Sequence, residues 1–527
     1  MKEGVHLQKD VNFLGGQRFD KEANKIYKVP VDKLPKRDFL NTSTNQVEEY
    51  VDFESEGFKK VLIDFINHHK EKQVPRLEEL KRYYMADNNI KYRADKSPNR
   101  ADNRIASDYA AFIVEFKQGV LLGNPVIYNG NEAIIERTEE FSNRNNEDYH
   151  NQLMALDDFI YGRAYELVTR NEEGVEIVTK FDVTETFIIY DTSNARNSLC
   201  GVRYYPIEFN NVITTVVEIY ANDGFLYVFE TEGADLENLE LKDGYPEEQF
   251  FNAVQINEWI NNEDRLGDFE KVLDKIDAYD LSQSEMANFQ QDSSEALLVI
   301  KGNPDTFKKA DGTLDKEGID YAQRARMMVL GDKKNYGEGV LGAEPDAKYL
   351  IKEYDVQGIE AYNDRTVADI LQFSKLVDFT DENMGGNQSG VGFRFKGWNS
   401  DNDRKNKERM ITKALMRRLR LLTYSWSIKD NLESDNHENL YDLVNDIVIK
   451  FTPNVPQSDK EVMEVIKGMD GLVSDQTIYE MAERLTGVSA EEESKRVDGE
   501  LKDRLNEPFE FEKKVEVEEV VENEGDI

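Results

Sequence analysis

A glycine-rich stretch, FTDENMGGNQSGVGFRF at residues 379–395, is the first candidate for a site with chemistry. Glycine clusters cradle phosphates when their backbone N–H groups converge at a helix N-terminus. No Gly-Lys-Ser/Thr sequence follows these glycines, and Lys396 comes only after the strand-like VGFRF. A dinucleotide fingerprint also fails, because it needs a strand before the glycines and a helix directly after them. The residues instead predict a loop that joins a helix to a strand.

The other residues that could carry chemistry do not form a recognisable site. Among the five histidines only His68 and His69 are adjacent, and helix neighbours diverge by about 100°, so we expect exposed histidines without a shared metal ion. Carboxylate pairs such as Asp157 and Asp158 arise by chance among 105 acids. The single Cys200 excludes an intramolecular disulfide and is typical of a reducing compartment. We predict no catalytic residue, no metal site and no cofactor.

A basic helix is predicted over residues 402–428. Its cations outnumber its acids, and between residues 404 and 420 Glu408 is the one acid. Such a cluster forms either a nucleic-acid-binding face or ion pairs with acidic surfaces of its own or a neighbouring subunit, and the sequence leaves both open. The residues considered for subunit contact or weak DNA contact are Arg404, Lys405, Arg409, Lys413, Arg417, Arg418 and Arg420.

Composition limits the partners. The chain has 527 residues, enough for several packed units, and 105 acidic against 66 basic residues give a formal net charge of −39. Tight nucleic-acid binding requires Lys and Arg that displace counterions from phosphates, so this balance argues against a protein that wraps DNA. The N-terminal MKEGVHLQKD lacks the apolar core of a signal peptide, and no run of about 18 apolar residues occurs. We expect a soluble cytoplasmic protein with no membrane partner.

The elements that position these residues change along the chain. Apolar residues recur at helical spacing from about residue 46, and we predict helices over RLEELKRYYMA (76–86), the region ending in Gly123-Asn124-Pro125, and the region 147–167. Period-two patterns on either side of NEEG (171–174) and NDG (222–224) then predict two hairpins. Helices therefore precede a β-rich part.

Two long helices bracket a small lobe in the next region. The first has an apolar stripe from Leu266 to Leu281, and the second has one from Val356 to Phe373. Between them, ALLVIKG, RMMVLGD and AKYLIKEY predict three short strands. The simplest geometry is an antiparallel helix pair with the lobe at its tip.

The two ends of the chain have different patterns. Residues 1–40 are polar and are interrupted by Pro30 and Pro35, which predicts an arm or linker. Residues 460–505 carry two helix-like segments, and the acidic tail NEPFEFEKKVEVEEVVENEGDI predicts disorder.

This order of parts resembles the portal proteins of long-tailed double-stranded DNA bacteriophages of the siphovirus type. The resemblance covers residues 46–505. Its local matches are LKRYYMADNNIKYR (80–93), NRADNRIASDYAAFIVEFKQGVLLGNPVIY (99–128), YGRAYELV (161–168), TETFIIYDTS (184–193), GVRYY (201–205), GDFEKVLDKIDAYDLSQSEMAN (267–288) and SGVGFRFK (389–396). The family more often has Ala and Leu where Gly392 and Phe393 stand.

The resemblance implies an α+β, mostly helical portal fold that assembles as a cyclic ring. Its implied regions are an N-terminal arm (1–45), a wing (46–265), a first stem helix (266–290), a clip (291–354), a second stem helix (355–376), a tunnel loop (377–391), a wing β-segment with the long basic helix (392–430), a crown (431–505) and an acidic tail (506–527).

The resemblance also implies the function. Twelve subunits would form a ring at one capsid vertex, through which double-stranded DNA is packaged and ejected. The implied partners are the terminase large subunit, head-completion or adaptor proteins, and the major capsid and scaffold proteins; assembly would occur in the host cytoplasm and the product would be a virion component. The chain itself would not be an enzyme, because a separate terminase drives the DNA.

The glycine-rich stretch would then be a loop that projects into the channel, where glycine permits backbone angles closed to other residues. Its channel-facing residues would be Val377, Asp378, Asp381, Glu382, Asn383, Met384, Gly385, Gly386, Asn387 and Gln388. The acids among them would repel phosphates. Two alternatives remain at this point: a metal-dependent nucleic-acid-processing enzyme, and another head structural or scaffold protein.

Overall fold

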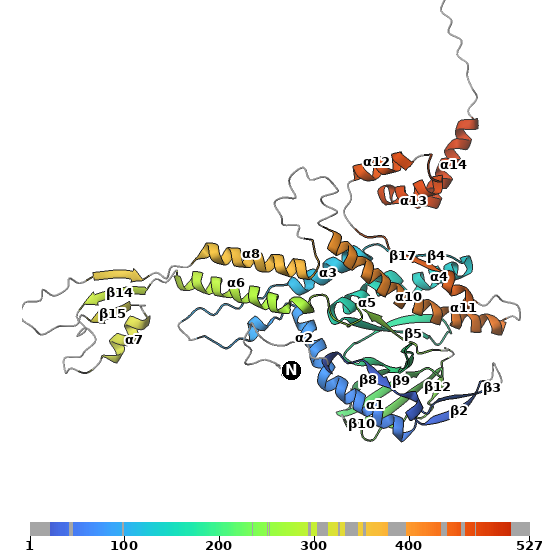
Figure 1. The fold of residues 1–527 in the computed structure, drawn as a ribbon, viewed down its shortest axis with the longest axis horizontal. Coiled ribbons are helices and arrows are strands. Elements are labelled where there is room, and N and C mark those ends of the chain that lie inside the picture. Colours follow the sequence, from blue (N-terminus) through green and yellow to red (C-terminus); the bar gives the residue numbers. More distant parts are fainter. Residues whose placement is uncertain are drawn as a thin grey trace, which may run out of the picture. The chain divides into compact units, whose positions relative to one another are not determined.

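A computed structural model describes residues 22–41, 46–96, 100–233, 235–249, 251, 253–293, 297–302, 313, 315–324, 327–331, 346–350, 355–377, 397–433, 440–454, 459–469 and 471–506. The chain divides into two units, Met1–Asn454 and Val455–Ile527. None of the helices in these described ranges is long and apolar enough to cross a membrane. Figure 1 shows the ribbon with the element labels used below.

The first part of the large unit is helical, as the sequence predicts. Its helices are α1 (Glu56–His68), α2 (Val74–Tyr84), α3 (Tyr109–Leu122), α4 (Glu132–Asn145) and α5 (Glu147–Tyr161). Side-chain caps set two of their starts, because Ser55 accepts the Phe58 N–H and Asn131 accepts the Ala133 N–H. α5 ends at Gly162, whose φ of +83° and close approach to Arg265 leave no room for a Cβ.

Two antiparallel hairpins form where the sequence predicts them. β5 (Arg163–Arg170) and β6 (Glu176–Phe181) join β13 (Ile256–Ile260) in a three-stranded sheet of order β13-β5-β6. β9 (Val212–Ala221) and β10 (Phe225–Glu232) belong to a seven-stranded sheet of order β1-β7-β8-β9-β10-β11, in which β12 also pairs with β10. Its remaining strands are β1 (Tyr27–Val29), β7 (Thr186–Asp191), β8 (Ser198–Phe209), β11 (Glu240–Leu241) and β12 (Glu247–Glu248).

The N-terminal region differs from the predicted arm. β1 pairs in parallel with β7, so that Tyr27 lies opposite Ile189 and is buried. β2 (Lys36–Asn41) pairs with β3 (Gln46–Val51), where the sequence pattern predicts the start of a helix. Strands this short show no clear alternation of apolar and polar residues, so the sequence does not predict them. Pro30 and Pro35 lie between these short elements and do not prevent them from packing. Residues 1–21 of the arm lie outside the described ranges.

The two long helices and the lobe between them are confirmed. α6 (Leu273–Ser293) begins seven residues later than predicted, and α8 spans Val356–Phe373. Lys275 near the start of α6 pairs with Asp369 near the end of α8 at 2.7 Å, so the helices run antiparallel and side by side (Figure 1). Between them in the chain lie β14 (Leu297–Gly302), α7 (Lys316–Arg324), β15 (Met327–Gly331) and β16 (Asp346–Leu350), with strand order β15-β14-β16.

The basic helix, α10 (Trp398–Glu433), is longer than predicted. α11 (Leu440–Leu443) and β17 (Val448–Lys450) follow it, and β17 pairs with β4 (Ile127–Asn129). These elements belong to the large unit, so only the later part of the region predicted as a crown forms the second unit. That unit contains α12 (Asp459–Met469), α13 (Asp475–Thr486) and α14 (Ala490–Asn506). The acidic tail after Asn506 lies outside the described residues.

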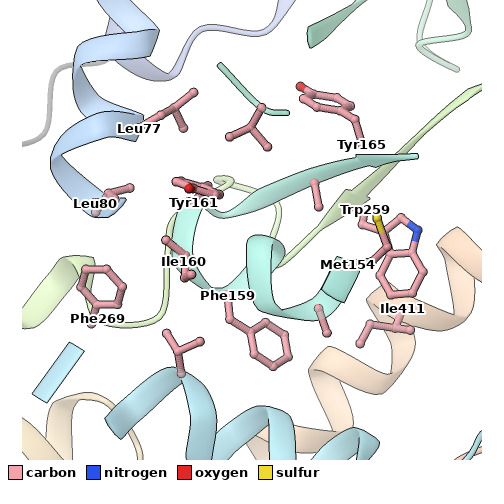
Figure 2. Close-up of a cluster of buried hydrophobic side chains, with 14 of the residues drawn as sticks. Leu77, Leu80, Met154, Phe159, Ile160, Tyr161, Tyr165, Trp259, Phe269 and Ile411 are labelled. Carbon is pink, nitrogen blue, oxygen red and sulfur yellow. The ribbon is translucent and has the colours of Figure 1, made fainter. Parts of the chain in front are cut away.

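The main hydrophobic core lies between helices of the large unit, among them α3, α5 and α10, and the three-stranded β13-β5-β6 sheet. Figure 2 shows Met154, Trp259 and Ile411 gathered where α5, β13 and α10 meet. Phe269, just before α6, belongs to the same core. α10 is therefore a packed helix of the large unit.

Candidate functional site

Of the predicted channel loop, residues 377–391, only the first residue belongs to the described part of the chain. Val377 is the last described residue after α8, and α10 begins at Trp398. Asp378, Asp381, Glu382, Asn383, Met384, Gly385, Gly386, Asn387 and Gln388 lie outside the described residues. The residues at which this segment leaves α8 and enters α10 therefore define the candidate site.

α8 ends in a well-formed Schellman motif. The Lys375 N–H donates to the Gln372 carbonyl and the Leu376 N–H donates to the Leu371 carbonyl at 2.9 Å. Lys375 occupies the left-handed position with φ of +63°, where glycine is the usual residue. Leu376 is buried behind it. This motif fixes the direction in which the chain leaves the helix.

Asp403 connects the two ends of the segment. Its Oδ1 accepts from Lys375 Nζ at 2.6 Å, and its Oδ2 accepts from Lys117 Nζ of α3 at 2.8 Å. Burial alone would raise the pKa of Asp403, but the charges of Lys117 and Lys407 outweigh that effect and hold the pKa at about 2. Asp403 is thus ionised at neutral pH and ties α8, α10 and α3 together.

Lys407 links α10 to the start of α6. Its Nζ donates to Asp268 Oδ1 at 2.7 Å and to Asn261, and it lies 3.9 Å from the centre of the Phe159 ring. Burial lowers the pKa of Lys407, and the nearby Asp268 opposes that shift. Through Asp403 and Lys407, one face of α10 contacts the end of α8 and the residues just before α6.

Arg418 is the centre of a buried ionic network. It donates from Nε and Nη2 to Glu166 at 3.0 and 2.5 Å, and from Nη1 to Glu147 at 2.7 Å. Glu166 also accepts from Asn257 Nδ2 at 2.7 Å and contacts His150 Nε2 at 2.9 Å. Burial would raise the pKa of Glu166, but Arg418 and His150 hold it well below its usual range. The guanidinium is 1 % exposed.

The basic helix is therefore not a continuous cationic surface. Arg418 is buried and paired within its own chain, so its prediction as a subunit or DNA contact is wrong; a charge pattern along one helix does not reveal partners distant in sequence. Of the other predicted contact residues, Arg404 forms ion pairs with Asp401 and Glu408, and Lys405 forms one with Asp401. Three arginines donate hydrogen bonds within the chain: Arg409 to Asn406, Arg417 to Ser198 and the Val254 carbonyl, and Arg420 to Asn445. Lys413 is exposed.

The other candidate residues of the sequence are structural. His69 is buried rather than exposed, and its Nδ1 lies 2.6 Å from the Tyr204 hydroxyl. Asp157 pairs with Lys180 at 2.7 Å, and burial raises the pKa of Asp158 well above its usual range. Cys200 is a buried free thiol. No group of three or more His, Cys, Asp or Glu that could hold a metal occurs in the part of the chain that the structure describes.

α6 carries a polar ladder that the sequence pattern did not predict. Backbone N–H groups of residues 101–107 donate to α6 side chains that are four residues apart. The pairs are Ser107 to Asp280 at 2.8 Å, Ile105 to Ser284 at 2.9 Å, Asn103 to Asn288 at 2.6 Å and Ala101 to Asp292 at 3.1 Å.

The two spacings of this ladder match. Four helical residues advance about 6.0 Å, and two extended residues advance about 6.6 Å, so successive rungs stay in register. Segment 101–107 therefore lies along three turns of α6, although the sequence pattern places part of it in a helix. The recurrence of Asp280, Ser284 and Asn288 at four-residue intervals is the signal that could have revealed the ladder.

A family model for phage portal proteins of the SPP1 Gp6-like type matches residues 63–506, most of the chain. This chain belongs to that family. It is therefore a phage portal protein, a structural protein of the capsid portal in the virion. Its α+β fold is the portal fold, and the family resemblance inferred from sequence is confirmed.

Solved structures with a similar chain include the virion of a native gene transfer agent (GTA) particle, at 10% identity and a TM-score of 0.35, covering 78% of this chain and 93% of that chain. The neck of the native GTA particle computed with C12 symmetry gives 10% identity and a TM-score of 0.35, covering 76% of this chain and 91% of that chain. No curated protein sequence matches this chain.

Proposed function

We propose that this portal protein forms a ring of twelve subunits at one capsid vertex, through which double-stranded genomic DNA is packaged and ejected. The observation that carries the proposal is the antiparallel pair of α6 and α8, with a small β lobe inserted between them and segment 378–396 directly after α8. α6 and α8 are the stem, and residues 291–354 are the clip.

The clip is the docking platform for the terminase large subunit and later for head-completion proteins. Residues 46–265 and 392–430 form the wing, which faces the major capsid and scaffold proteins, and the helices after residue 455 form the crown. The chain assembles in the host cytoplasm and performs no catalysis, because the terminase drives DNA movement.

Residues 377–391 are the loop that lines the channel. The anchors described above hold its two ends, since Lys375 and Asp403 are paired across it. Asp378, Asp381 and Glu382 repeat around the ring and repel the DNA backbone. The net charge of −39 supports a conduit that does not grip DNA, because each phosphate pairing with a cation adds affinity and slows sliding.

Light scattering and negative-stain imaging of the purified chain test the ring. Twelve copies of a 60.9 kDa chain give a closed assembly of about 0.7 MDa. We expect particles near that mass with a central hole. A monomer or dimer at all salt and protein concentrations would contradict the ring.

A further inference from the structure

β8 and β9 continue beyond the seven-stranded sheet as a two-stranded ribbon. The last β8 residue that pairs with β7 is Arg203, and the last β9 residue that pairs with β10 is Thr214, whereas β8 and β9 stay paired as far as Phe209 and Val212. Residues 208–213 therefore extend beyond both neighbouring strands. The turn between them consists of Asn210 and Asn211, whose φ angles of 51° and 63° are those of a tight hairpin turn. The ribbon is a short and well-defined projection.

One face of this ribbon is apolar and exposed. Phe209 lies directly opposite Val212, and Ile207 lies two residues from Phe209 on the same face. Their exposed fractions are 73%, 51% and 45% in that order. Glu208 is the single charged residue between Tyr204 and Thr215. An apolar face on a projecting ribbon is a surface that a partner covers.

The charge of the chain favours a second copy as that partner. Two copies with a net charge of −39 repel each other, so a projecting surface that joins them is favoured when it adds few acids of its own. The ribbon meets this requirement. A nucleic acid does not fit, because the ribbon offers no Lys or Arg to a phosphate.

The same unit of the chain contains a hollow of complementary character. It has a volume of about 430 Å³ and lies between β4, α4 and α5. Its apolar walls include Pro125, Ile127 and Ile135. The carboxylates of Glu139, Glu147 and Asp148 also line it, and Glu147 is paired with Arg418. No Lys or Arg lines it. The apolar wall fits the Phe209 ring, and the carboxylates accept hydrogen bonds from the amide groups of the Asn-Asn turn.

The edge of the hollow extends the apolar surface. Val448 of β17 pairs with Asn129 of β4, so it lies on the same face as Ile127, two residues away. Both are exposed in the single chain, Ile127 at 47% and Val448 at 56%. A ribbon seated in the hollow would therefore contact Ile127 and Val448 with its apolar face, in addition to the contacts of its tip.

We propose that the β8–β9 ribbon of one subunit seats in the β4–α4–α5 hollow of the next subunit around the ring. The two surfaces differ, so the contact is head-to-tail, which is the class of contact that a cyclic ring requires. This inference rests on the proposed ring, and it adds the residues that join neighbouring wings.

The first test compares native masses of single variants over a range of protein concentrations. Phe209→Asp puts a carboxylate opposite the acidic hollow, and we expect the concentration for half-assembly to rise about tenfold or more. Leu472→Asp is the matched control, since Leu472 is 81% exposed in the other unit, and it should assemble as the wild type does. Because Phe209 is exposed, the far-ultraviolet circular dichroism of the variant should be unchanged.

A cross-linking test identifies the seat. A chain carrying Phe209→Cys and Ile127→Cys is treated with a short bismaleimide, and Cys200 stays unreactive because it is buried. We expect a ladder of linked chains on a denaturing gel, absent from either single-cysteine variant.

The outcomes separate this proposal from the ring itself. Wild-type rings together with equally stable Phe209→Asp rings would overturn the ribbon contact and leave the ring intact. Weakened Phe209→Asp rings without a ladder would overturn the hollow as the seat. A wild-type chain that never forms rings would overturn the ring and the contact together.

Discussion

Replacing Arg418 with Met tests whether the buried ionic network of α10 stabilises the large unit of the chain. The guanidinium is 1 % exposed and bonds Glu166 through two nitrogens and Glu147 through a third. The Arg418→Met variant leaves two carboxylates buried beside each other without their cation. Removal of one partner from a buried pair costs roughly 3–5 kcal/mol, and we expect the unfolding free energy to fall by that amount.

Urea unfolding at a fixed protein concentration measures the change. Trp259 reports locally, because its ring lies 5.5 Å from the Arg418 guanidinium carbon. The double variant Arg418→Met with Glu166→Gln should lose less than the sum of the two single variants, by about 1–3 kcal/mol, since it removes one of the stranded charges. Lys413→Met, on the exposed side of the same helix, is the control and should stay within about 0.5 kcal/mol of wild type.

A loss below about 1 kcal/mol with additive single variants would refute this reasoning, because it would mean that water reaches the carboxylates. The result also guides assembly experiments. An Arg418→Glu variant would place a third carboxylate beside Glu147 and Glu166. Loss of rings in that variant would therefore report misfolding rather than a lost subunit contact.

Two further predictions concern His69 and the α6 ladder. Burial lowers the pKa of His69 to about 3, so folded His69 stays neutral while the unfolded chain takes up a proton below pH 6.5. The contribution of neutral His69 to the free energy of unfolding is complete above pH 6.5 and is lost as the pH falls. Between pH 6.5 and 5, the unfolding free energy of the wild type should therefore fall by about 1.5 kcal/mol more than that of the His69→Phe variant. Urea unfolding at each pH measures this difference. An equal slope in both proteins would contradict the assignment. Ser284→Ala removes the acceptor of the Ile105 N–H and should cost about 1–3 kcal/mol, with faster amide exchange at Ile105. Ser282→Ala on the same helix is its control, and unchanged exchange at Ile105 in the Ser284 variant would show that the ladder opens readily to water.

Local patterns were sufficient for much of the fold. The three apolar runs between residues 296 and 354 form β14, β15 and β16, and the two long apolar stripes form α6 and α8. Period-two residues around short Asn- and Gly-containing turns predict the β5–β6 and β9–β10 hairpins. In each of these elements the decisive signal lies within about twenty residues of chain.

The parts that the sequence could not predict depend on distant partners. Arg418 meets Glu166, which is 252 residues away in the sequence, and a cation on a helix looks the same whether it is buried or exposed. Tyr27 is buried because β1 pairs with β7, and a strand of three residues is too short to show a pattern that predicts this pairing. The ladder on α6 was hidden because polar residues at four-residue spacing suggest a solvated face, while here they bind an extended segment.

The internal use of cations bears on the proposed passage of DNA. Lys407 and Arg418 are buried in ion pairs, and Arg404 is held between Asp401 and Glu408 on the helix surface. Each such pair neutralises one acid as well as one base, so the net charge of −39 is unchanged. Fewer cations then remain on the surface to bind a phosphate. A phosphate could recruit Arg404 only by displacing carboxylates that already bind it. The ion pairs that α10 makes within the large unit therefore also keep these cations from binding DNA.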